Sequence, residues 1–204
     1  MNFSSVNVLS SFGHEIRNKL ITHDQAADYL TVLFPGGNNT YEHPLLYYPG
    51  NVAFRAGSDL LGIEYGYHHS GYPCSFEIFE SSLKETLEAL RRCDIEKYRR
   101  VIFISKSFGT VIAGEATRQF GTVDIRNLFL TPIARTVPYI NEIDCTVVYG
   151  TADPHFTQDD AGKITGGKQV IALPEADHSL QFGSDYRVSL EYLIRICEIT
   201  EGFL

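Results

Sequence analysis

The sequence predicts an α/β protein with a mostly parallel, doubly wound sheet, an antiparallel hairpin at its N-terminal end and helices on both faces. Continuous apolar runs, typical of strands covered on both faces, recur along the chain. Segments with helical periodicity alternate with these runs, as crossovers between parallel strands require. The 204 residues and 44% hydrophobic content fit one compact domain over residues 1–204, without a separate cap domain.

The chain begins with segments that predict strands. Val6–Ser10 and His14–Thr22 alternate polar and apolar residues, and Ser11–Gly13 between them favours a hairpin. Tyr29–Phe34 is a continuous apolar run rich in strand formers. Pro35–Gly37 follows it directly and predicts an abrupt end to this strand.

Helix and strand then alternate for the first time. We expect a helix within His43–Asp59, interrupted at Pro49 and Gly50, and a strand over Leu61–Tyr67. Ser75 is placed to cap a long helix, because apolar residues follow it at three- and four-residue spacing. Those residues are Phe76, Phe79, Leu83, Leu87 and Leu90.

The second half of the chain repeats this alternation. Val101–Ser105 predicts a strand, and Thr110–Phe120 predicts a helix that Gly121 ends. A final helix is expected after Ser184, which can act as its cap. Three further apolar runs predict strands: Arg126–Thr131, Cys145–Gly150 and Lys168–Pro174.

Charge and composition exclude several classes of partner. The formal charge of −8 gives no general attraction to nucleic acid or to an anionic membrane. No apolar run approaches the roughly 18 residues of a membrane span, and the N-terminal segment lacks the pattern of a signal peptide. We therefore expect a cytoplasmic protein with no nucleic-acid partner and no membrane span.

Ser107 stands directly after a predicted buried strand, between Ser105 and Gly109. A serine at the tip of a tight strand-to-helix turn is exposed for nucleophilic attack, but the turn tolerates only small residues two positions before and after it. The segment Ser105–Gly109, SKSFG, nearly meets this demand. On its own the pattern is weak, because a serine before a helix is more often a simple N-cap.

Two further loops follow strands and carry the groups that a serine nucleophile needs. Asp153 lies in the loop after Cys145–Gly150, where the simpler interpretation is an Asp-Pro turn. His178 lies in the loop after the last strand, where a lone histidine is usually a surface residue. Ligands bind parallel sheets at the carboxyl ends of the strands, so we expect Ser107, Asp153 and His178 to meet there as nucleophile, carboxylate and base.

The order Ser–Asp–His along the chain resembles that of the α/β-hydrolase superfamily, and the resemblance covers essentially the whole sequence. It carries Ser107 in SKSFG, Asp153 in YGTADPHF and His178 in EADHSL. It implies the α/β-hydrolase fold and a small, lid-less serine hydrolase that needs no cofactor. Ser105 departs from the family pattern, in which glycine is usual, and this leaves the subfamily open.

An oxyanion hole is expected from two backbone N–H groups. By the resemblance one belongs to Phe108, directly after the nucleophile, and the other to Gly37 in the loop FPGGNNT. Asn38 is a second candidate in the same loop. The simpler interpretation is an ordinary Pro-Gly-Gly turn. Phosphate binding is disfavoured, because the chain has no G-x-x-x-x-G-K-[ST] pattern.

The sequence offers several candidates for residues that contact the substrate. The connection Pro132–Asp144 is short, and its Ile133 and Val137 are candidate pocket walls or simply cover the sheet. His68 and His69 follow another strand and are candidate substrate contacts. No cluster of ligand residues completes a metal site, so we expect no metal. The oligomeric state is left open.

These observations predict a hydrolase that acts on a small acyl substrate, an ester or thioester, through an acyl-enzyme. An amide or peptide hydrolase on the same scaffold is one alternative. A non-catalytic binding protein that keeps the fold is another, although the complete set of Ser107, Asp153 and His178 disfavours it.

Overall fold

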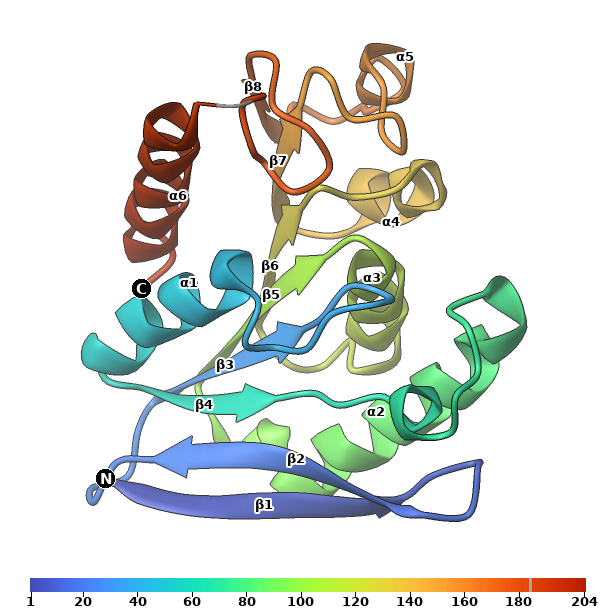
Figure 1. Ribbon diagram of the computed structural model, residues 1–204. Coiled ribbons are helices and arrows are strands. Elements are labelled where there is room, and N and C mark those ends of the chain that lie inside the picture. The colour runs from blue at the N-terminus through green and yellow to red at the C-terminus, as the bar shows by residue number, and fades with distance from the viewer. Residues whose placement is uncertain (184) are drawn as a thin grey trace.

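The computed structural model describes residues 1–183 and 185–204, with the side chain of Phe76 outside the description. An eight-stranded sheet has the order β1-β2-β4-β3-β5-β6-β7-β8. β1 and β2 form an antiparallel hairpin that pairs antiparallel to β4, and the other neighbours are parallel (Figure 1). This confirms the predicted class of sheet. The strands are β1 Asn2–Leu9, β2 Glu15–Thr22, β3 Tyr29–Phe34, β4 Ser58–Gly62, β5 Arg100–Lys106, β6 Ile125–Leu130, β7 Cys145–Gly150 and β8 Gln169–Leu173.

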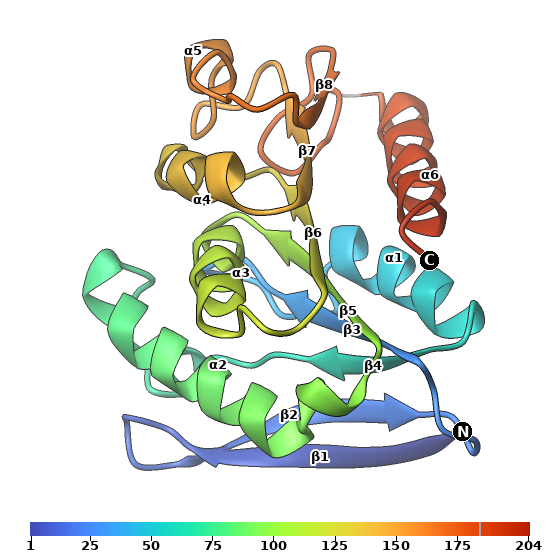
Figure 2. The ribbon, with the colours of Figure 1, turned by 180° about the vertical axis from the view of Figure 1, so that it is seen from behind.

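Helices cover both faces of this sheet. Figures 1 and 2 show α1 and α6 on one face and α2, α3 and α4 on the other. In the part of the chain that the structure describes, no helix combines the length and the apolar composition of a bilayer span. The helices are α1 Pro44–Arg55, α2 Phe79–Cys93, α3 Phe108–Gln119, α4 Val137–Glu142, α5 Gln158–Ala161 and α6 Tyr186–Glu201.

The central strand β5 shows why the apolar runs are continuous. Its side chains alternate between two separate cores. Val101 and Phe103 pack in the core beneath α2 and α3, whereas Ile102 and Ile104 pack in the core beneath α1. All four side chains are fully buried, so this part of the strand is apolar on both faces.

The segment predicted as one helix over His43–Asp59 divides into α1 and the start of β4. The helix ends at Arg55, and the chain turns at Gly57, where φ is +99°. Asp59 lies in β4, and its buried carboxylate accepts hydrogen bonds from the His23 N–H and the Tyr98 hydroxyl. These partners are distant in sequence, which is why local pattern placed Asp59 in the helix.

The strand predicted over Leu61–Tyr67 is correct only for its first two residues, where β4 ends. The chain then leaves the sheet and forms a 3₁₀ turn at Gly66–His69, whose first N–H donates to the buried carboxylate of Glu85. Tyr65 and Tyr67 are buried all the same, within the core beneath α2 and α3. Burial by a loop and burial in a strand give the same apolar pattern.

Two predicted helix caps have different outcomes. The hydroxyl of Ser75 accepts the Glu77 N–H and begins a 3₁₀ turn at Phe76–Ile78 that precedes α2. Ser184, predicted to cap the last helix, lies outside the described residues. Asp185 acts as the N-cap of α6, and its carboxylate accepts the Arg187 N–H.

Gly109 at the start of α3 permits the closest contact between this helix and the end of β3. A Cβ there would lie 2.4 Å from the carbonyl oxygen of Pro35 and 2.6 Å from that of Phe34. Because these are backbone atoms, we expect Gly109→Ala to lower the free energy of unfolding by about 1–3 kcal/mol. Thermal melts should show Tm lower by roughly 2–4 °C for each kcal/mol.

Gly121→Ala is the matched control for this change. Its Cβ would meet only the Arg118 carbonyl oxygen at 3.5 Å, an ordinary contact distance. Equal melting temperatures for the two variants would contradict the steric argument at Gly109.

Candidate active site

Ser107 occupies a strained turn between β5 and α3. Its φ of +52° and ψ of −122° lie in a region that residues with side chains rarely adopt. The turn is fixed on both sides: the Ser107 N–H donates to the Leu130 carbonyl at 3.1 Å, and Thr110 donates to the Ser107 carbonyl through both its N–H and its hydroxyl. Such a turn lifts the serine side chain off the end of the sheet.

The two flanking positions explain why the turn can be this tight. Gly109 faces the backbone of the β3 end at the short distances given above. Ser105 is fully buried, and its hydroxyl has no hydrogen-bond partner among the described residues. Its hydroxyl therefore makes no polar contact that would explain a serine there, and the small size that the turn demands is what Ser105 supplies in place of glycine.

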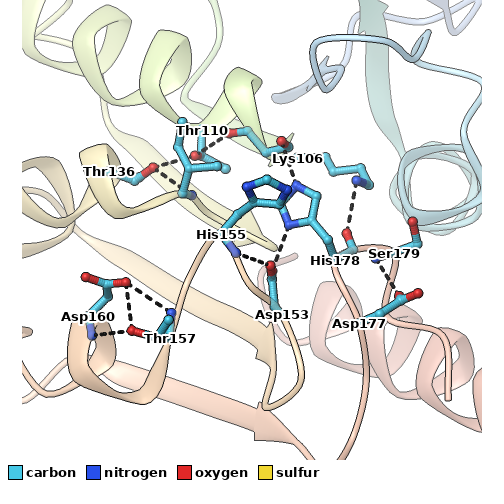
Figure 3. Close-up of polar contacts among 12 residues, drawn as sticks. Lys106, Thr110, Thr136, Asp153, His155, Thr157, Asp160, Asp177, His178 and Ser179 are labelled. Atoms are coloured by element: carbon cyan, nitrogen blue, oxygen red, sulfur yellow. Dashed lines mark hydrogen bonds and ion pairs between the residues drawn. The ribbon is translucent and has the colours of Figure 1, made fainter. Parts of the chain in front are cut away.

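Asp153 and His178 follow neighbouring strands β7 and β8, and their side chains point toward one another (Figure 3). The distance from His178 Nδ1 to Asp153 Oδ2 is 2.7 Å, and that from His178 Nε2 to Ser107 Oγ is 2.8 Å. A carboxylate only accepts hydrogen bonds, so Nδ1 carries the proton and Nε2 is left to accept the serine proton. Asp153 and Ser107, which lie 25 and 71 positions before His178, thus form one hydrogen-bonded chain with it.

The carboxylate of Asp153 is buried and doubly held. The residue is only 3% exposed, and its second oxygen accepts the His155 N–H at 2.8 Å. The His155 ring lies against the His178 ring in an edge arrangement, with centroids 4.6 Å apart. These contacts hold the Asp153 carboxylate in place. Because the carboxylate accepts the His178 Nδ1–H, they also fix the orientation of the His178 ring.

Gly150 brings the two loops together. A Cβ at this position would lie 2.0 Å from the Ala176 carbonyl oxygen, a separation that no side chain could tolerate. The same carbonyl accepts the Ala152 N–H at 3.0 Å. The end of β7 therefore touches the loop after β8, and this contact sets the distance between Asp153 and His178.

The loop after β3 lies beside Ser107 and is anchored from behind. The Gly37 carbonyl accepts hydrogen bonds from the Tyr67 hydroxyl at 2.5 Å and from His68 Nε2 at 3.0 Å. A Cβ on Gly37 would lie 2.2 Å from Cys74 Sγ, so the loop runs where only glycine fits without movement. Gly37 and Phe108, the predicted oxyanion-hole residues, both border the cavity at Ser107.

An open cavity of about 360 Å³ surrounds the nucleophile. Of the predicted pocket residues, Asn38 and Ile133 line it. Its lining comprises Gly37, Asn38, Asn39, Cys74, Ser75, Lys106, Ser107, Phe108, Ile133, His155 and His178. Among the described residues no group of three or more histidine, cysteine or acidic side chains is arranged to hold a metal ion.

No protein-family model matches this chain, and no curated protein matches it. Solved structures do. A lid-less α/β serine hydrolase from Xanthomonas campestris superposes with a TM-score of 0.69 at 11% identity, over 100% of this chain and 96% of that one. An α/β serine hydrolase homologue from Coxiella burnetii gives 0.70 at 9% identity, over 97% of each chain. A dienelactone hydrolase from Anabaena variabilis gives 0.69 at 12% identity, over 97% of this chain and 95% of that one. The chain has the α/β-hydrolase fold.

Three other predicted pocket residues, His68, His69 and Val137, are not among the residues that line this cavity, and their contact with substrate stays a prediction. His68 points at the Gly37 carbonyl from behind the loop. The His69 side chain is 63% exposed and faces Glu64. Val137, at the start of α4, is buried in the core beneath α2 and α3. The sequence places these residues after predicted strands but does not show which way their side chains turn.

Several cavity residues were not predicted from the sequence to lie at the site. Asn39, Cys74 and Ser75 lie in two loops that gave no signal of a shared wall, whereas His155 stood two positions after Asp153 and could have been found. Burial raises the pKa of the Cys74 thiol, so it is protonated and a poor nucleophile at neutral pH.

Lys106, the residue before the nucleophile, is the most unexpected of the cavity residues. It is only 2% exposed, and its ammonium donates to the His178 carbonyl at 3.2 Å. Burial lowers its pKa, against the attraction of the Asp153 and Asp177 carboxylates. Its place within SKSFG, directly before Ser107, was the available signal.

Proposed function

We propose that this protein is a serine hydrolase that cleaves a carboxylic ester or thioester of a small acyl substrate through an acyl-enzyme. The observation that carries the proposal is the chain of two short hydrogen bonds from Asp153 through His178 to Ser107, which ends on a hydroxyl in a strained turn. Strain of this kind persists where the surroundings enforce it, and it gathers at functional sites.

In the first half-reaction Ser107 Oγ attacks the substrate carbonyl carbon while its proton moves to His178 Nε2. The imidazole becomes positively charged, and the Asp153 carboxylate at 2.7 Å stabilises that charge. The carbonyl oxygen becomes an oxyanion, which the N–H groups of Gly37 and Phe108 receive. Asn38 is the less favoured donor, through its N–H or its side chain. The bond to the leaving group then breaks, and the alcohol or thiol takes the proton from His178.

In the second half-reaction a water molecule repeats these steps. His178 takes one of its protons, the resulting hydroxide attacks the acyl carbon, and Ser107 leaves with the proton restored. The anchored loop matters in both halves. Because Tyr67 and His68 hold the Gly37 carbonyl, the loop is fixed before the charge develops, and preorganised donors of this kind are often the largest catalytic term.

The comparisons support the reaction class. The solved structures that resemble this fold include proteins described as serine hydrolases, an esterase domain and a dienelactone hydrolase. At 11–12% identity they support a hydrolase on this scaffold, and the bond that is cleaved has to be measured.

A substrate panel tests the proposal. Purified protein is assayed with p-nitrophenyl esters of short and long acids, with acyl-CoA thioesters and with aminoacyl p-nitroanilides. We expect turnover of esters or thioesters and none of it in Ser107→Ala. Preferential cleavage of the anilides would instead favour an amide or peptide hydrolase. No turnover of any compound, together with no reaction of Ser107 with a fluorophosphonate, would leave a binding protein that keeps the fold.

The oxyanion-hole assignment makes its own prediction. In Gly37→Ala the new methyl group collides with Cys74 Sγ at 2.2 Å and displaces the loop, so we expect kcat to fall by about 10² to 10³, as when one donor is lost. Replacing Cys74 by glycine in the same chain removes the colliding atoms and should restore most of the rate. A Gly37→Ala variant with wild-type kcat would contradict the role of this loop.

A further inference from the structure

The cavity at Ser107 contains a buried positive charge. Lys106 is 2% exposed, and lysine is almost never buried to this degree unless its charge is paired. It lines the same cavity as Ser107 and His178. Figure 3 shows its side chain reaching toward the loop that carries His178. The charge is therefore placed beside the nucleophile rather than on the outer surface of the domain.

This ammonium has three N–H donors, and among the described residues one acceptor is found for it, the His178 carbonyl at 3.2 Å. No carboxylate of the described chain lies within ion-pair distance of it. The Asp153 carboxylate is occupied by His178 and His155. One carboxylate oxygen of Asp177 accepts the N–H groups of Ser179 and Gln181.

The remaining lining of the cavity also favours a negative group. None of its eleven residues is acidic, although acidic residues outnumber basic ones 25 to 17 in the whole chain. Asn38, Asn39 and Ser75 add side chains that can donate hydrogen bonds. Nearby His43 does not compete as a cation, because burial and the Lys106 charge lower its pKa to about 4.

We propose that Lys106 is an anion-binding residue and that the natural substrate carries a carboxylate that pairs with its ammonium inside the cavity. The inference rests on the proposed function and names its substrate class. A buried charge without a partner costs several kcal/mol, and a substrate carboxylate supplies both the missing counter-charge and acceptors for the unused N–H groups. A neutral ester of the same shape leaves the charge uncompensated and should be the poorer substrate.

Matched ester pairs test this selectivity. On the acyl side, mono-p-nitrophenyl glutarate is compared with its neutral methyl ester. On the alcohol side, p-acetoxybenzoate is compared with methyl p-acetoxybenzoate, and rates without protein are subtracted. We expect kcat/KM to favour the anionic member of at least one pair by about 10- to 100-fold, as for a hydrogen bond to a charged group. The pair that shows the preference identifies which part of the substrate carries the charge.

Lys106→Met removes the charge and keeps a long unbranched side chain. We expect its loss of kcat/KM to be about 10- to 100-fold greater for the anionic ester than for the neutral one, whereas Lys106→Arg should retain part of the preference. Lys84→Met, at an exposed position on α2, is the matched control and should leave the ratio unchanged. Equal losses for both esters would mean that Lys106 only holds the His178 carbonyl, and would overturn the proposal.

Binding without turnover separates this inference from the proposed function. Calorimetry with Ser107→Ala should show glutarate binding at least about tenfold more tightly than the neutral glutaramide. This holds even if the protein hydrolyses no ester, and it does not depend on whether Lys106→Met folds. Equal affinity for glutarate and glutaramide, or no binding of either, would overturn the anion site.

Discussion

Replacing Ser107 by alanine is expected to lower kcat by about 10⁶, the largest effect of any single change in this chain. In the proposed mechanism the hydroxyl supplies the bond to the acyl group. Cys74, which also borders the cavity, is a poor replacement, because burial raises the pKa of its thiol. The assay is steady-state hydrolysis of the best ester from the panel, with thermal melts of both proteins to show that the fold is retained.

The same experiment extends to the base. His178→Ala is expected to cost about as much as Ser107→Ala, and the double variant no more than either one, because the residues act as a unit. Additive losses would mean that the two side chains act independently. That result would contradict a functional hydrogen bond between Ser107 Oγ and His178 Nε2, which are 2.8 Å apart. A Ser107→Ala protein with wild-type turnover would remove the serine from the chemistry.

Asp153→Asn should give the second large effect, a loss of roughly 10⁴ in kcat with little change in KM. The asparagine amide can donate to His178 Nδ1, and the imidazole proton would then move to Nε2. That nitrogen can no longer accept the Ser107 proton across 2.8 Å. Asparagine has the shape of aspartate, and residue 153 is only 3% exposed, so packing changes little. The loss of kcat therefore measures the effect of the missing carboxylate charge and of the changed His178 tautomer.

Asp159→Asn is the control for this change. It removes one carboxylate from the same part of the chain, at an exposed position in α5, and should leave kcat unchanged. If Asp153→Asn and Asp159→Asn were equally active, the carboxylate would have no special relation to His178.

The sheet and the edge that carries the proposed site were predictable because both depend on local pattern. A strand buried on both faces is apolar on both faces, as β5 is from Val101 to Ile104. Small residues at Ser105 and Gly109 are required by a turn as tight as the one at Ser107. Once the strands are placed in order, Asp153 and His178 necessarily follow neighbouring strands, and their loops open at the same edge.

The misplaced elements depend on contacts between distant parts of the chain. Asp59 reads as the end of a helix, but it belongs to β4, where its carboxylate accepts hydrogen bonds from His23 and Tyr98. Tyr65 and Tyr67 read as strand and are buried by a loop instead. Such choices are settled by tertiary packing, which overrides local propensity.

The cavity wall was the least predictable part. His68 was expected directly after a strand, but it lies in the 3₁₀ turn at Gly66–His69 and its ring donates to the Gly37 carbonyl. Lys106 occupies a position whose side chain could have turned to either side of the sheet end, and only the structure places it beside His178. The sequence therefore predicts the order of the proposed nucleophile, carboxylate and base along the chain. Which other residues face the cavity depends on the direction of their side chains, and this direction is known only from the structure.

The most direct test of the catalytic chain is the site of reaction with a fluorophosphonate, read by mass spectrometry of the intact and digested protein. The wild-type protein should gain one phosphonyl group, located on Ser107, and His178→Ala should react at least about 10³-fold more slowly, because its serine has no base. An adduct on another residue, or labelling of His178→Ala at the wild-type rate, would contradict a nucleophile activated by His178 and Asp153.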